Sequence, residues 1–146
     1  FNRGSAHLDL SEYEQAIQDY DKAIPLDPDN WLVHYNRGLA YDYIDQHENA
    51  IQNYDQAIRL NPRHAVTYNN RGLAYARLHK IHQALENVDE AIRLDPEFLE
   101  AYKNRALFHT VIGEDANAQK DANKAIELGI DPDFIKEEIE KAKEQR

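Results

Sequence analysis

The stretch Tyr35–Tyr41 reads YNRGLAY, and it returns as NNRGLAY at Asn69–Tyr75. Two weaker copies flank this pair, FNRG at Phe1–Gly4 and KNRA at Lys103–Ala106. The small residue inside the phrase recurs every 34 residues, at Gly4, Gly38, Gly72 and Ala106. A fixed period of this length indicates a repeat protein, in which each unit packs mainly against its neighbours.

Three further columns of residues keep the same interval. They are Ala16, Ala50, Ala84 and Ala118, then Ala23, Ala57, Ala91 and Ala125, and the prolines Pro28, Pro62 and Pro96. Several independent columns with one period exclude a chance repetition of a single phrase. The period predicts one domain made of units 1–30, 31–64, 65–98 and 99–130, followed by a terminal segment 131–146.

Each unit is predicted to form two helices. In the second unit Asn30 is a candidate N-cap for a helix ending near Tyr43, and Pro62 stops a second helix because the residue before proline is pushed away from helical geometry. The segments Ser11–Glu14 and Asp45–Glu48 carry a capping residue followed three positions later by Glu, which predicts that second helices begin there. A lone helix pair cannot bury its apolar face, so the pairs are expected to stack into an all-α solenoid.

Small residues are predicted to mark the crossing of the two helices. Gly38 and Ala50 allow the backbones to approach, and Tyr41 and Tyr54 are expected to fill the space beside them. These columns resemble the tetratricopeptide repeat family, whose small, aromatic and proline positions match Gly38, Ala50, Ala57, Tyr41, Tyr54 and Pro62. The resemblance extends from Phe1 to about Leu128. It implies a right-handed α-solenoid of antiparallel helix pairs that binds other proteins.

Both ends depart from the family pattern. The first helix begins part-way through its repeat, which predicts an exposed solenoid end at Phe1 and a parent protein that continues upstream. Pro25 is expected to shorten or kink the helix in which it lies. A final helix over about 133–144 is predicted to be a C-terminal cap, packing through Phe134, Ile135, Ile139 and Ala142.

Composition argues against several function classes. The formal charge of −10 disfavours nucleic-acid binding, and the absence of Cys excludes disulfides and thiolate metal sites. No apolar run approaches the roughly 18 residues of a membrane span, so membrane insertion is not expected. No catalytic motif is present, and we predict a protein that is not an enzyme and needs no cofactor. The sequence does not determine the compartment, although a soluble protein of the cytoplasm is favoured.

Histidine and arginine residues are interpreted structurally. His79 and His82 have a metal-pair spacing, but they lie at a predicted turn and lack further ligands, so no metal is expected. Half-buried packing positions are predicted for His7, His34, His47 and His109. The arginine column is expected to pack its alkyl stems and to pair with acids of the second helices. Its members are Arg3, Arg37, Arg71 and Arg105, and the acids are Asp21, Asp55 and Asp89.

The asparagine column lies on another stripe of the first helices. In the family this stripe lines the concave groove, and an asparagine ladder there resembles the one in O-GlcNAc transferase and related repeat arrays. An amide both donates and accepts, so such a ladder can hold a peptide backbone. The alternative is that these residues merely solvate a helix surface. The predicted peptide-binding residues are Asn2, Asn36, Asn70, Asn104, Tyr35, Leu39, Tyr43, Asn69, Leu73, Arg77 and Lys103.

A known family specificity is not supported. Some cochaperones of this family clamp a C-terminal carboxylate through lysines, asparagines and an arginine at set positions. In one register only Asn36 fits this set, and in the other only Asn70 fits, because the remaining positions hold Phe1, Ser5, Val66 and Asn70, or Tyr35, Leu39, Glu100 and Asn104. The carboxylate clamp is therefore absent.

The expected function is a scaffold for a protein or peptide partner held in the concave groove. Arg77, Lys80 and Lys103 near one half of the groove favour a partner that is extended, partly apolar and acidic at one end. Two alternatives remain. The chain could be a spacer that self-associates through its solenoid ends, or the substrate-recruiting arm of a larger enzyme.

Overall fold

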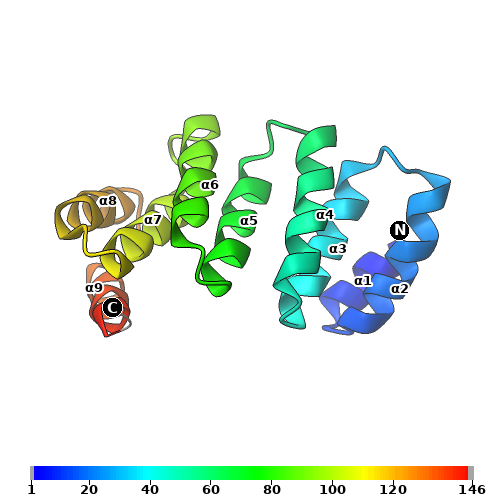
Figure 1. Cartoon of the computed structure of the whole chain (residues 1–146), viewed down its shortest axis with the longest axis horizontal. Coiled ribbons are helices and arrows are strands. Elements are labelled where there is room, and N and C mark those ends of the chain that lie inside the picture. The colour runs from blue at the N-terminus through cyan, green and yellow to red at the C-terminus, as the bar shows by residue number, and fades with distance from the viewer. Residues whose placement is uncertain (1, 145–146) are drawn as a thin grey trace.

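The computed structural model describes residues 2–144, which form nine α-helices and one 3₁₀ helix (Figure 1). The helices lie side by side in a row, so that the two ends of the chain are far apart (Figure 1). None of the helices in this part of the chain is long and apolar enough to span a membrane. Their bounds are α1 (Asn2–Asp9), α2 (Tyr13–Ala23), η1 (Ile24–Leu26), α3 (Trp31–Tyr43), α4 (His47–Leu60), α5 (Ala65–Arg77), α6 (Ile81–Leu94), α7 (Leu99–Val111), α8 (Asp115–Glu127) and α9 (Pro132–Lys143).

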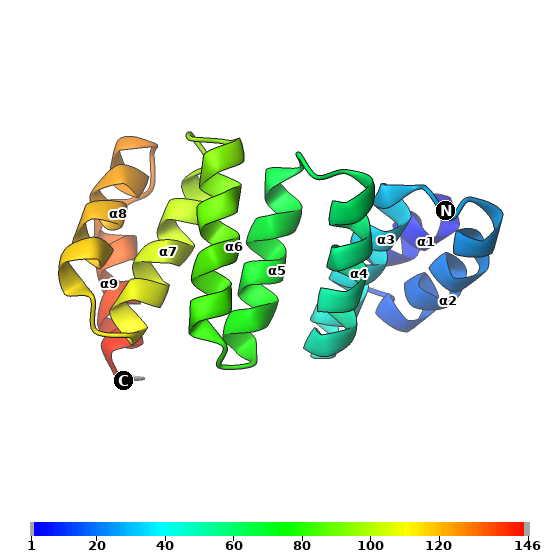
Figure 2. The ribbon, with the colours of Figure 1, turned by 45° about the horizontal axis from the view of Figure 1, so that its top comes forward.

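The helices pack as consecutive pairs, α1 with α2, α3 with α4, α5 with α6 and α7 with α8. The second helix of each pair also packs against the first helix of the next pair, which joins the pairs into one stack (Figure 2). This architecture confirms the predicted all-α solenoid. Phe1, to which an exposed end was assigned, lies outside the described residues.

The helix crossing predicted at Gly38 is confirmed. A Cβ atom on Gly38 would lie 2.7 Å from Cε1 of Tyr54, and one on Gly4 would lie 2.7 Å from Cε1 of Tyr20. Each glycine therefore makes room for a tyrosine ring that is fully buried. In the last pair Ala106 replaces the glycine and Ala122 replaces the tyrosine. These two alanines pack in one cluster, so no ring is present that would need a glycine opposite it.

Three arginines of the column bind the predicted aspartates, and these bonds join neighbouring pairs. Arg37 on α3 donates from Nε to Oδ1 of Asn53 on α4 (2.7 Å) and from Nη1 to Oδ1 of Asp21 on α2 (2.6 Å). Equivalent bonds link Arg71 to Asn87 and Asp55, and Arg105 to Asp121 and Asp89. Each of these three guanidinium groups thus binds its own pair and the pair before it.

The predicted starts of two second helices are wrong. Asp45 and Ser11 do not cap a helix, because they adopt left-handed φ values of 57° and 61° in the turn between helices. The N-cap positions are Gln46 and Glu12, so each helix begins one residue later than predicted, at His47 and Tyr13, and neither start has a side-chain cap. His79 and Gly113 occupy the same left-handed position in the other two pairs. A sharp reversal between antiparallel helices requires this conformation, which Asp and Gly adopt more readily than most residues.

Pro25 ends the regular helix, as predicted. Helix α2 stops at Ala23 and continues as the 3₁₀ turn η1, whose second residue is Pro25. The change of winding leaves Leu26 86% exposed. An uncovered leucine therefore marks this corner of the first pair.

Helix α9 forms the predicted cap, with two differences. It begins at Pro132, where Asp131 accepts a hydrogen bond from the backbone N–H of Phe134 (2.8 Å). Ile135 is buried with Ala106 and Ala122, which covers the end of the last pair. Phe134 does not join this contact: it lies at the third position of the helix, and its side chain is 47% exposed.

Candidate functional site

Two adjoining cavities lie along the first helices α3, α5 and α7. The smaller, about 180 Å³, is lined by Leu39, Asp42, Tyr43, Tyr54, Asn70, Leu73 and Arg77. The larger, about 560 Å³, is lined by Leu73, Ala76, Arg77, His79, Ile81, Leu107, Phe108, Val111, Glu138, Lys141 and Ala142. Because Leu73 and Arg77 line both, the two cavities form one continuous surface, which we call the groove.

The structure brings five of the predicted binding residues together in the smaller cavity. They are Leu39, Tyr43, Asn70, Leu73 and Arg77. These side chains come from α3 and α5, where a spacing of four residues places them on one side of each helix. The arrangement offers leucine and tyrosine surface beside an amide and a guanidinium.

The asparagine column reaches back to the preceding pair. Asn36 hydrogen-bonds the phenol of Tyr20 on α2, and Asn70 Nδ2 donates to the hydroxyl of Tyr35 on α3 (3.2 Å). Asn104 Nδ2 donates to Oδ1 of Asn69 on α5 (2.9 Å). Each of these three amides therefore helps to hold neighbouring pairs together.

The column is not equally accessible along its length. Asn104 and its partner Asn69 are both only 4% exposed, whereas Asn36 and Asn70 are half-buried. Asn2 is exposed at the start of α1, and half-buried Lys103 lines neither cavity of the groove. Asn70 is the member of the column that lines the smaller cavity.

An aromatic cluster adjoins the groove at the start of α3. The ring of Tyr35 lies 6.1 Å from that of Tyr54 and 5.4 Å from the imidazole of His64, which also contacts Trp31 at 4.6 Å. Burial raises the pKa of Tyr35 and lowers the pKa of His64. At the other end of α3, Tyr43 is 61% exposed and stacks on Tyr13 at 4.6 Å.

A buried carboxylate forms one wall of the smaller cavity. Asp42 accepts a hydrogen bond at Oδ2 from the Tyr54 hydroxyl (2.9 Å), and its Oδ1 lies 2.9 Å from Nδ1 of His47. Burial raises the pKa of Tyr54, which keeps this phenol protonated as the donor. Arg77 approaches the same Oδ1 of Asp42 with Nη1 at 3.5 Å.

Helix α9 supplies a wall of the groove that the sequence reasoning missed. Glu138, Lys141 and Ala142 face the larger cavity opposite residues of α5 and α7. α9 packs chiefly on α7, the first helix of its neighbouring pair, whereas α3, α5 and α7 pack chiefly on second helices. The sequence feature that could have indicated this position is Gly129–Ile130, two residues more than the earlier repeats have before their proline. Gly129 takes a φ of 113°, and the chain turns back there.

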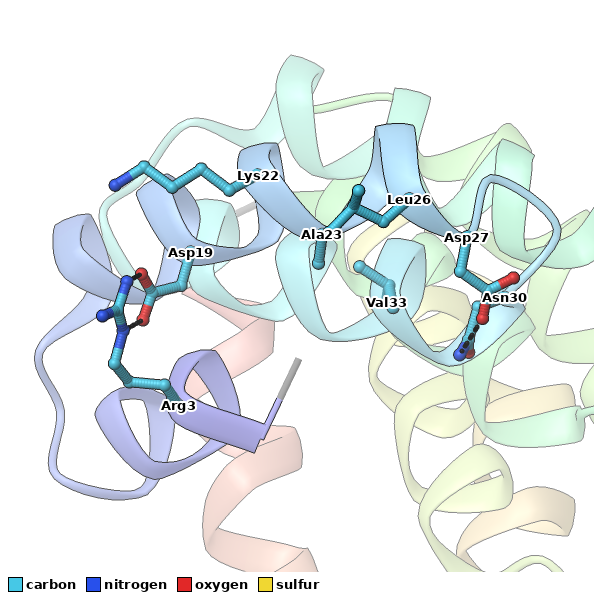
Figure 3. A pocket seen from close by; sticks show the side chains of 8 residues that line it. All are labelled: Arg3, Asp19, Lys22, Ala23, Leu26, Asp27, Asn30 and Val33. Atoms are coloured by element: carbon cyan, nitrogen blue, oxygen red, sulfur yellow. Dashed lines mark hydrogen bonds and ion pairs between the residues drawn. The ribbon is translucent and has the colours of Figure 1, made fainter.

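A separate cavity of about 310 Å³ lies at the N-terminal end of the stack (Figure 3). Figure 3 shows the guanidinium of Arg3 paired with Asp19 on one side, and Asn30 donating to Asp27 on the other. Leu26 lies between them beside Val33. This cavity is lined by α1, α2, η1 and α3 and shares no residue with the groove.

The histidines take structural positions. His34 is buried, with Nε2 3.1 Å from the carbonyl oxygen of Pro28, and His7 and His109 pair with Glu12 and Glu114. His79 lies in the turn before α6, as expected. Residues 2–144 contain no group of three or more side chains that could hold a metal ion.

Comparison with known proteins identifies the family. A TPR repeat model matches residues 4–42, and a tetratricopeptide repeat model matches residues 31–64 and 65–98. The chain belongs to the tetratricopeptide repeat family. A search of curated protein sequences gave no significant match.

Solved structures with a similar fold support this assignment. A crystal structure of MamA is 30% identical, with a TM-score of 0.81 over 86% of this chain and 68% of MamA. The second TPR domain of human RPAP3, solved with the HSP70 peptide SGPTIEEVD, is 29% identical, with a TM-score of 0.71 over 73% of this chain and 89% of that domain. The first TPR of Spaghetti (RPAP3), bound to the HSP90 peptide SRMEEVD, is 25% identical, with a TM-score of 0.72 over 78% of this chain and 90% of that one.

Proposed function

We propose that this protein is a non-catalytic interaction scaffold whose groove binds an extended peptide or a partner helix. The observation that carries the proposal is the continuity of the two cavities through Leu73 and Arg77, which gives an apolar track with a few polar groups along it. Sites that bind ligands commonly combine apolar lining with a small number of placed polar groups. Family members that bind chaperone peptides support a peptide partner in general.

Within the groove, Leu39 and Leu73 would receive apolar side chains of the partner, while Asn70 would bind its backbone. Half-buried Asn36 lies outside the two cavities on the same stripe of α3 and would extend this backbone contact towards the first pair. Each asparagine amide has two donor hydrogens and an acceptor oxygen, so the bond to the preceding pair leaves further hydrogen-bonding capacity. Because Asn104 is buried, its contribution would be to hold α7 against α5. The proposed contacts therefore concentrate at Asn36 and Asn70.

A peptide array tests this proposal. We expect the wild type to bind a subset of peptides, and the double variant Asn36→Ala, Asn70→Ala to bind them about tenfold more weakly, because each lost amide bond contributes about 0.5–1.5 kcal/mol. The matched control replaces two exposed asparagines of second helices, Asn49→Ala and Asn123→Ala, and should bind as the wild type does. Circular dichroism establishes that both variants are folded. Equal loss in the control, or no loss in the groove variant, would contradict the assignment of these asparagines.

A second candidate function is self-association through the N-terminal end. Here Leu26 is 86% exposed and lines the cavity of Arg3 and Val33, which leaves an apolar side chain for a second copy of the chain to contact. Sedimentation velocity over a hundredfold concentration range separates the two functions. A protein that self-associates should show a sedimentation coefficient that rises with concentration, and Leu26→Ser should abolish that rise. A scaffold that only binds peptides should show neither effect.

A further inference from the structure

Arg77 differs from the arginines that hold the fold together. Arg37, Arg71 and Arg105 contact their aspartates at 2.5–2.6 Å and are about 20% exposed. Arg77 lies 3.5 Å from Asp42, which is longer than an ordinary N–H···O hydrogen bond, and its side chain is 51% exposed. Its guanidinium therefore faces both cavities of the groove with donors to offer.

Asp42 is hydrogen-bonded without Arg77. Its two oxygens are bound by the Tyr54 hydroxyl and by the His47 imidazole, each at 2.9 Å. His47 and Arg77 approach the same oxygen, Oδ1, from α4 and α5. Two groups that can carry positive charge thus share one carboxylate oxygen at the wall of the groove.

We propose that Arg77 binds a carboxylate of the peptide in the groove, because Asp42 is already hydrogen-bonded by Tyr54 and His47 and leaves the Arg77 donors to a ligand. This inference rests on the proposed function, since it concerns the same groove. The ligand is a peptide segment in which an acidic side chain stands beside an apolar one, the apolar group lying between Leu39 and Leu73. Charge-assisted hydrogen bonds between a guanidinium and a carboxylate are stronger than hydrogen bonds between neutral groups. The acidic residue of the peptide should therefore raise its affinity for the groove.

A paired peptide library tests the ligand class. Each peptide carries two large apolar residues and is made once with Glu or Asp beside them and once with Gln or Asn. At pH 6.5 the wild type should prefer the acidic member of a pair by about tenfold. Arg77→Gln should remove this preference while retaining binding to the amide member, and the matched control Arg63→Gln, an exposed arginine outside the groove, should retain the preference.

The outcomes separate the two proposals. If peptides bind without any acidic preference, or if Arg77→Gln leaves the preference unchanged, the inference about Arg77 is overturned and the binding groove stands. If no peptide of either kind binds the folded wild type, both the groove and the inference fail.

Discussion

Replacing Tyr54 by Ala is expected to lower the free energy of unfolding by about 4 kcal/mol, within the range for deleting a buried aromatic ring. Tyr54 is fully buried, and its ring fills the space that Gly38 leaves open at the crossing of α3 and α4. Removal of a fully buried ring at this crossing should leave a cavity between the two helices. Urea unfolding followed by circular dichroism measures the change.

Two further variants show how much of this loss comes from the buried ring: Tyr54→Phe removes only the hydroxyl, and Tyr43→Ala is the control at an exposed tyrosine. Tyr54→Phe keeps the ring and removes the donor to buried Asp42, which should destabilise the protein by about 1–3 kcal/mol. Tyr43→Ala removes a tyrosine that is 61% exposed and should change stability by less than about 1 kcal/mol. A loss at Tyr54→Ala no larger than at Tyr43→Ala would mean that the crossing of α3 and α4 is not packed as described.

Replacing Leu73 by Ser is expected to weaken peptide binding by about 30-fold, equivalent to about 2 kcal/mol, the size typical of an anchor residue at the centre of an interface. Leu73 lines both cavities, so one substitution interrupts the apolar track at its midpoint. Fluorescence anisotropy with the strongest peptide from the array measures the change in dissociation constant.

The control for this variant is Leu60→Ser. Leu60 is a partly exposed leucine near the end of α4 and lies outside the groove, so its substitution should leave affinity unchanged. Both variants must show the helical circular dichroism of the wild type. Equal affinity of Leu73→Ser and wild type would place the peptide somewhere other than the groove.

The solenoid could be predicted from the sequence because one repeat specifies its own geometry. The period of 34 residues, the glycine opposite a large ring and the proline after the second helix each have a local physical reason, and the structure contains the helices they predict. The second helices that begin at Tyr13 and His47 were predicted to begin one residue too early. A left-handed turn residue and an N-cap are both favourable positions for Asp, so the residue type at Asp45 does not distinguish them.

The site could be predicted only in part. Residues of one helix stripe, such as Leu39 and Tyr43 or Leu73 and Arg77, meet in one cavity because helical spacing alone places them together. The bond between Asn104 and Asn69 depends instead on how one pair is rotated against the next, which no pattern within a repeat encodes. The position of α9 over the larger cavity likewise follows from the turn at Gly129 rather than from its own amphipathic pattern.

The most direct test of the central claim is to map a bound peptide on the protein by NMR. We would titrate ¹⁵N-labelled protein with the strongest peptide from the array and assign the backbone amides whose signals shift. The groove predicts that the largest shifts cluster on α3, α5 and α7 around Leu39, Leu73 and Arg77, with a smaller set on α9 near Lys141. Shifts concentrated on α4, α6 and α8, or around Arg3 and Leu26 at the N-terminal end, would contradict the groove as the binding surface.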